Sequence, residues 1–140
     1  MPPFISRLTG ITQDDLITEP HSREILPSFL DFLGDAVIVA HNAPFDERFI
    51  SFNCHKYMLD APGNSLFDTL LLTRRLFPEL RCHGLAALTS LFGIPHEVKH
   101  RSMPDVMGTR GVFMQCLERL KTKDIQTPQQ FDTWYGDPLY

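Results

Sequence analysis

The stretch AVIVAHNAPFDERFI, residues 36–50, joins a short apolar run directly to a cluster of polar and charged side chains. Residues 36–40 are apolar and rich in β-branched side chains, and turn-forming residues flank them, which predicts a strand buried on both faces. Pro44 suits the first turn of a helix, so a helix should follow at once. Asn42 and Asp46 would then lie at the carboxyl end of a strand, where open α/β sheets bind ligands.

The same residues also allow a purely structural interpretation. Asn42 could cap the helix, and Asp46 could complement the positive helix terminus. A second polar cluster, HRSMPD over residues 100–105, offers the same choice, because Ser102 and Asp105 have the spacing of a capping box. Taken alone, each cluster fits a structural role.

Strands and helices alternate on both sides of the opening stretch. Helices are predicted over 22–34, from Pro44 onward, over 84–93 and over 102–120, and a short strand over 65–68 feeds a helix that Pro78 ends. The apolar positions of the helix after Pro44 include Phe45, Phe49 and Phe52, with Met58 as a further candidate. This alternation indicates an α/β layered domain. Only two strands are clear, however, whereas an open sheet usually has about five or six.

Composition restricts the function classes. A chain of 140 residues with 43% hydrophobic content corresponds to one globular domain. The net charge of −4 argues against a broad, nonspecific nucleic-acid-binding surface, but it allows an enzyme that grips one chain end through metal ions. Three scattered cysteines indicate a reduced, cytoplasmic setting. The spacing His96-x3-His100 suits zinc, yet it lies in a predicted loop and no Cys-x2-Cys pair accompanies it.

Together, VAHNAPFD (39–46) and HRSMPD (100–105) resemble the second and third motifs of the DnaQ-like DEDDh 3′→5′ exonucleases, the family of the proofreading subunit of DNA polymerase III. Three other segments match in order: ISRLTGIT (5–12), FDTLLLTRRLFP (67–78) and HGLAALTSLFGI (83–94). The resemblance implies an α/β fold of the ribonuclease-H-like kind, truncated at its amino end so that the first strands are absent. Residues 4–122 would form the C-terminal two-thirds of an exonuclease domain, followed by a tail over 123–140 with one short helix.

The resemblance also implies the site. Asp46 and Asp105 would be ligands of a two-metal site that takes Mg²⁺ or Mn²⁺, since these hard cations require oxygen ligands. His100 would be the general base, because an imidazole titrates near neutrality. Asn42 and Phe45 would orient the motif-two carboxylate and the last nucleotides, and Thr9 and Gly10 would lie near the terminal base. The implied reaction is removal of nucleotides from the 3′ ends of DNA, or of RNA.

One departure from the family pattern concerns its first motif. That motif is a D-x-E on the first strand, and no Asp-x-Glu occurs in this sequence. Fewer carboxylates should weaken metal binding, and an open sheet edge should pair with a second copy or with a partner chain. The alternative function is therefore a catalytically impaired nucleic-acid-binding or assembly module that needs a partner to complete its fold.

Other polar and aromatic residues have two interpretations each. Arg74, Arg75 and Arg81 could contact phosphates or form an ordinary solvated face. The tail aromatics Phe131, Trp134 and Tyr135 could stack on bases, although helical spacing favours core packing. For Asp68, a helix cap is favoured over a metal ligand.

Overall fold

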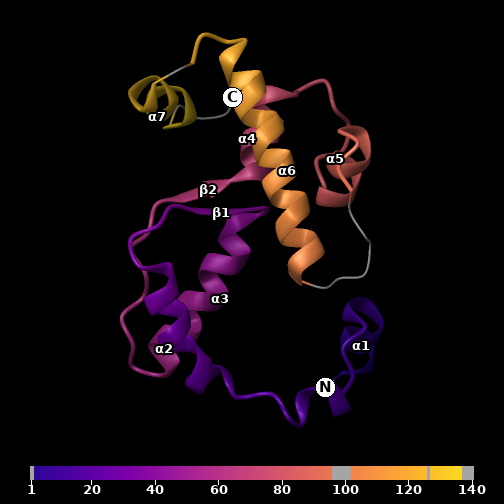
Figure 1. Cartoon of the computed structure of the whole chain (residues 1–140), viewed down its shortest axis with the longest axis vertical. Coiled ribbons are helices and arrows are strands. Elements are labelled where there is room, and N and C mark those ends of the chain that lie inside the picture. Colours follow the sequence, from indigo (N-terminus) through magenta and orange to yellow (C-terminus); the bar gives the residue numbers. More distant parts are fainter. Residues whose placement is uncertain (1, 96–101, 126, 137–140) are drawn as a thin grey trace.

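The computed structural model describes residues 2–95, 102–125 and 127–136 and has a mixed α/β architecture. The elements, in chain order, are α1 (Pro3–Thr9), the 3₁₀ turn η1 (Asp14–Leu16), α2 (Ser22–Leu33), β1 (Ile38–Ala40), α3 (Ala43–Lys56), β2 (Leu66–Asp68), α4 (Thr69–Leu76), α5 (Leu85–Leu91), α6 (Ser102–Lys121) and α7 (Pro128–Gly136). Helix α6 runs through the middle of the molecule beside α4 and α5 (Figure 1). Across the described residues, none of the helices has both the length and the apolar composition needed to cross a bilayer.

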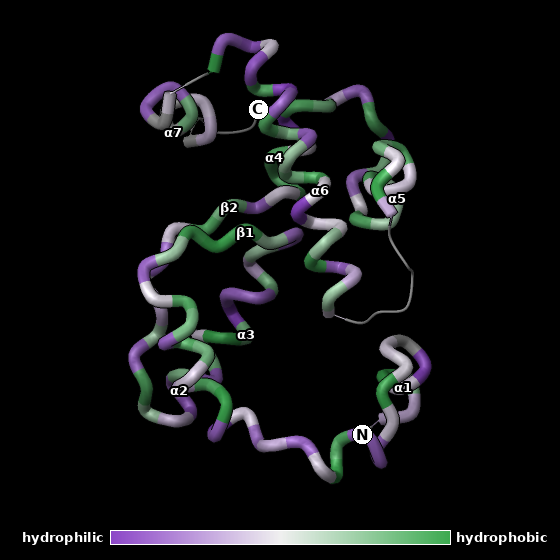
Figure 2. The backbone as a smooth tube through the Cα atoms, in the orientation of Figure 1, coloured by the Kyte–Doolittle hydropathy of each residue, from purple (hydrophilic) through white to green (hydrophobic). Residues whose placement is uncertain are grey.

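The sheet consists of β1 and β2, paired in parallel, within the part of the chain that the structure describes. The register pairs Ile38 with Leu66 and Ala40 with Asp68, so both strands end at the same edge. Both strands are largely hydrophobic (Figure 2). The prediction that β1 is buried on both faces is wrong, because each of its three residues is only half-buried. Helices α3 and α6 pack against this strand without enclosing it.

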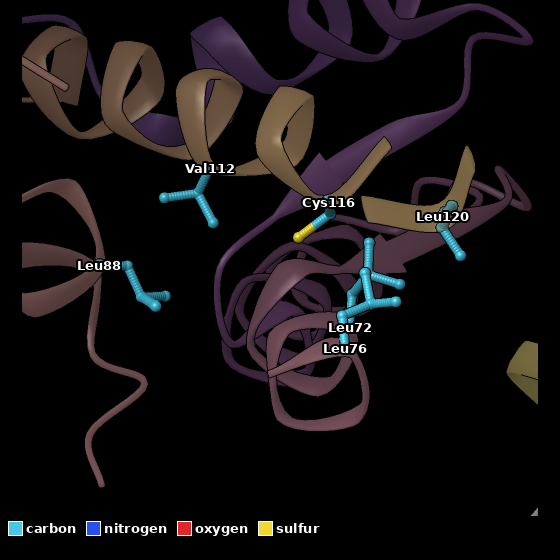
Figure 3. Packing of buried hydrophobic residues seen from close by; sticks show 6 residues of the cluster. All are labelled: Leu72, Leu76, Leu88, Val112, Cys116 and Leu120. Carbon is cyan, nitrogen blue, oxygen red and sulfur yellow. The ribbon is translucent and has the colours of Figure 1, made fainter. Parts of the chain in front are cut away.

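The main core lies between α4, α5 and α6. Its buried members, drawn as sticks in Figure 3, are Leu72, Leu76, Leu88, Val112, Cys116 and Leu120. Helix α6 approaches the segment after α5 so closely that a Cβ atom on Gly111 would come within 2.8 Å of the Ile94 side chain. A glycine costs helix stability in isolation, and here it allows this close approach.

Helices α2 and α3 are less well covered. The apolar positions Phe45, Phe49 and Phe52 of α3, and Met58 just beyond its end, are between 63% and 93% exposed. Helix α2 buries Leu26, and Pro27 lies inside the helix rather than at its start. Because a proline lacks an amide proton, the helix lacks one internal hydrogen bond at this point.

The tail forms the predicted helix, α7. Thr127 and Gln130 exchange the reciprocal hydrogen bonds of a capping box at 3.0 and 3.2 Å. Phe131 and Tyr135 pack edge-to-face against Phe67 of β2, with ring centroids 5.1 and 5.9 Å apart. Core packing of these aromatics is therefore confirmed.

The amino-terminal segment contains a helix that the sequence pattern did not indicate. Helix α1 ends at Gly10, whose φ of 70° favours glycine. The capping-box spacing of Thr12 and Asp15 predicts a helix that begins there. Their capping bonds form at 2.8 and 3.2 Å, but only the short turn η1 follows. The extended chain after this turn leaves α1 apart from the sheet and the other helices (Figure 1).

Candidate active-site cleft

The carboxyl ends of the two strands are tied together by Asp68. Its Oδ1 atom accepts hydrogen bonds from the Leu70 and Asn42 amides, both at 2.9 Å. The predicted helix-capping role of Asp68 is confirmed by the first of these bonds. The second bond fixes the turn after β1, where Asn42 adopts a left-handed conformation with φ 67°. Asparagine tolerates this conformation better than most residues.

Asn42 is the N-cap residue of α3 by position, but its side chain makes no capping hydrogen bond. The structural interpretation of Asn42 as a side-chain cap is therefore wrong. Its backbone instead turns the chain from β1 into α3. Asp46 then lies in the first turn of that helix, as the sequence predicted.

A cleft of about 720 Å³ opens beside these strand ends. Asp46 of α3 lines one part of it, and Asp105 of α6 lines another. The full lining consists of Val39, Ala40, His41, Asp46, Leu85, Ala86, Ser102, Asp105, Val106, Thr109, Arg110 and Phe113. Two carboxylates that are remote in the chain thus share one concave surface, which has the size of a small-ligand site.

The surroundings of Asp46 shift the titration of its carboxyl group. Burial raises the pKa of its carboxyl group, and the negative charge of Asp68 raises this pKa further, while a hydrogen bond from the backbone of Asp46 itself opposes the shift. The environment therefore disfavours a bare carboxylate at this position. A bound cation would relieve both the desolvation and the repulsion.

His41, at the end of β1, forms the other polar part of the cleft wall. The Thr69 hydroxyl donates to the Ala40 carbonyl at 3.3 Å and also lies within hydrogen-bond distance of His41 Nδ1, at 2.9 Å, where the donor is set by the His41 tautomer. Burial lowers the pKa of His41, whereas Asp68 and a hydrogen bond to the His83 backbone oppose the shift. Arg74 and His83 add smaller lowering contributions through their charges. The imidazole is accordingly held in place as a mainly neutral group at neutral pH.

The structure places the predicted site residues in three groups. Asp46 and Asp105 line the cleft, whereas Asn42, the residue before α3, and the exposed Phe45 in its first turn do not. Thr9 and Gly10 belong to the end of α1 and are not among the lining residues. His100 lies outside the described residues.

Three lining residues were missed from the sequence. His41 directly precedes Asn42 at the strand end, a position that could have drawn attention to it. Thr109 and Arg110 follow Asp105 on α6, and helical periodicity alone places Thr109 on the same face as the carboxylate. Arg110 gave no local signal, because a single arginine on a helix usually faces solvent.

Comparison with known proteins gives consistent results. The family model RNase_T, described as exonuclease, matches residues 1–113. A PolC-type DNA polymerase III of Caldanaerobacter subterraneus subsp. tengcongensis is 35% identical over 130 residues, which cover 93% of this chain and 9% of that polymerase. The PolC-type enzyme of Halalkalibacterium halodurans is 36% identical over 133 residues, covering 95% of this chain and 9% of its own length. The chain thus spans about a tenth of the length of these curated relatives.

Proposed function

Because this chain belongs to the RNase_T exonuclease family, whose model spans residues 1–113, we propose that it removes nucleotides from the 3′ ends of nucleic-acid strands with divalent metal ions. The observation that supports this most strongly is the shared cleft of Asp46 and Asp105. DNA is the favoured substrate, since the relatives are PolC-type DNA polymerases. RNA is the second substrate class to test.

The donor atoms of the cleft fit Mg²⁺ or Mn²⁺ in chemistry, because hard cations bind carboxylate oxygens. When bound, such ions stabilise the negative charge that develops on a reacting phosphate. Within the described residues, no three His, Cys, Asp or Glu side chains are grouped so that they could hold an ion. Asp46 and Asp105 would therefore supply two carboxylate ligands, and water molecules and substrate phosphates would complete the coordination, as is usual for Mg²⁺.

The side chains of this chain have distinct proposed roles. Asp46 and Asp105 hold the cations, and His100 takes a proton from the water that attacks the phosphodiester. Asn42 orients Asp46 through the turn, and the exposed ring of Phe45 contacts the last base. Contacts from Thr9 and Gly10 to the terminal base would require α1 to approach the cleft.

A second candidate function rests on the sheet. Two short, half-buried parallel strands are unusual, because parallel sheets are normally covered on both faces. This favours an assembly in which further strands, from a longer polypeptide or from a partner, extend and cover the sheet. On its own, the chain would then bind nucleic acid with little or no turnover.

The deciding experiment is a nuclease assay with single-stranded DNA labelled at its 5′ end, in Mg²⁺ or Mn²⁺. We expect the labelled strand to shorten stepwise in wild-type protein and to remain intact with His100→Ala or Asp105→Asn. Asp124→Asn is the matched control, because Asp124 lies in an exposed turn with φ 57°, which asparagine tolerates. This control should keep the wild-type rate.

Three results would contradict the proposal. Shortening that persists in both site variants would come from a contaminating nuclease. Immediate release of the labelled 5′ nucleotide would indicate the opposite polarity. An intact strand with every protein, combined with measurable binding, would favour the second candidate function.

A further inference from the structure

The cleft is lined by two carboxylates and one arginine. Asp46 and Asp105 are its carboxylates, and Arg110 is the one Lys or Arg side chain among its lining residues. The phosphates of a nucleic-acid strand are themselves anions, so the two carboxylates alone would repel the strand. A fixed cation in the same cleft would offset part of this repulsion.

Arg110 is also positioned to reach a different part of the strand from the carboxylate on its own helix. It follows Asp105 by five residues on α6, which places it about 7.5 Å farther along the helix axis. At 100° per residue, the two side chains leave opposite edges of the face that lines the cleft, with Thr109 between them. Asp105 and Arg110 would therefore contact different phosphates.

The guanidinium of Arg110 is available for such a contact. Its side chain is exposed and makes no ion pair or hydrogen bond with any residue that the structure describes. Arg75, by contrast, lies over the Trp134 and Tyr135 rings and donates to the Trp134 carbonyl. Arg119 pairs with Glu79 at 4.0 Å and lies over Phe77.

The other exposed arginines considered for phosphate binding lie elsewhere. Arg74 and Arg81 are exposed but do not line the cleft. One guanidinium group can bind two oxygens of a phosphate through two parallel N–H donors. This bidentate contact fixes both the position and the orientation of the phosphate. Arg110 combines this chemistry with the right location.

We propose that Arg110 binds a backbone phosphate of the substrate strand, next to the phosphate held at Asp46 and Asp105, and so sets how the strand enters the cleft. This inference rests on the proposed function for the identity of the ligand. It adds a substrate-binding residue on the helix that follows the HRSMPD motif.

The test measures binding of a short, fluorescein-labelled oligothymidylate to the full chain by fluorescence anisotropy. The buffer contains CaCl₂, because Ca²⁺ is a hard cation whose looser coordination disfavours hydrolysis of the strand. Arg110→Gln should weaken binding by about tenfold, because a charge-assisted hydrogen bond to phosphate is lost. The slope of log K against log salt should fall by about 0.7, the contribution of one phosphate contact in a single strand.

Two further variants separate charge from geometry. Arg110→Lys should keep the wild-type salt slope but recover only part of the affinity, since an ammonium group cannot bind in the bidentate manner. Arg81→Gln is the matched control, an exposed arginine outside the cleft, and should change neither quantity. A fall in slope of equal size in Arg81→Gln would show a diffuse charge effect and overturn the proposal.

Replacing single phosphates by uncharged methylphosphonates locates the contact. One position should weaken binding to wild-type protein and have no effect on Arg110→Gln. Wild-type affinity and salt slope in Arg110→Gln, or a wild-type chain that does not bind the strand, would refute the inference. Binding that depends on Arg110 without any shortening of the strand in Mg²⁺ or Mn²⁺ would refute the exonuclease function and keep the inference.

Discussion

Helices α4, α5 and α6 form a closely packed unit, whereas α2 and α3 leave much of their apolar surface exposed. In the first unit, Leu72 and Val112 are completely enclosed. In the second, Phe49 and Phe52 are 63% and 67% exposed. The same kind of side chain is thus core in one half of the molecule and surface in the other.

The candidate site lies where these two regions meet. Asp46 belongs to the loosely covered region and Asp105 to the closely packed one, and the cleft joins them. The site therefore combines a carboxylate on a helix of the packed unit with one whose position depends on how α3 is supported. Asp68 provides that support through its bonds to the Asn42 and Leu70 amides.

The largest expected effect is the difference in the free energy of unfolding between substitutions of core and of exposed apolar side chains. Leu72→Ala should lower the free energy of unfolding by about 2–5 kcal/mol, since the space it leaves is fully enclosed. Phe49→Gln should change this free energy by less than about 0.5 kcal/mol, because the ring faces solvent. Urea denaturation measures both values. A loss for Phe49→Gln as large as that for Leu72→Ala would mean that a partner or a second copy covers α3 in solution.

The next effect concerns the close contact within the packed unit. Gly111→Ala places a Cβ atom 2.8 Å from Ile94 and should destabilise the protein by about 1–3 kcal/mol. The sign is informative, because alanine normally stabilises a helix relative to glycine. Gly63→Ala, which meets nothing within 4 Å, is the control, and thermal unfolding followed by circular dichroism is the measurement. Stabilisation by Gly111→Ala would show that α6 and Ile94 are not so tightly packed.

Metal binding should depend on carboxylates from both regions. At a free ion concentration ten times the dissociation constant, Mg²⁺ or Mn²⁺ should stabilise the wild-type protein by about 1.4 kcal/mol. Asp46→Asn and Asp105→Asn should each abolish this gain in a thermal-shift titration, while Asp124→Asn should retain it. Stabilisation by the metal that depends on only one of the two carboxylates would show that Asp46 and Asp105 do not bind the same ion.

The smallest effect is the pH dependence from His41. Burial lowers its pKa below 6.5 in the folded protein, so the unfolded chain takes up the proton first as the pH falls. Its contribution to stability is therefore complete above pH 6.5 and decreases as the pH falls through the interval down to the folded-state pKa. His41→Gln should flatten this part of a stability–pH profile obtained from urea titrations. An unchanged slope of the stability–pH profile would mean that another group titrates in this pH range.

Much of the local structure was predictable. The helix after Pro44, the Asp68 cap and the capping box at Thr127 each depend on residues within a few positions of one another, and all three formed as expected. Burial was less predictable, because the pattern of phenylalanines on α3 indicates an apolar face but not whether anything covers it. Helix α1 has no strong periodic signal, and it was missed.

The sequence by itself determined the start of the helix after Pro44 and the caps at Asp68 and Thr127, and it placed Asp46 just beyond a strand. These features follow from short-range hydrogen bonding and backbone preferences. The motif resemblance predicted that Asp46 and Asp105 come together, and the structure places both in one cleft. Only the tertiary structure decided that Arg110 lines this cleft and that Phe49 remains exposed. Proximity between segments that are remote in the chain arises from the packing of whole elements, and no local pattern encodes it.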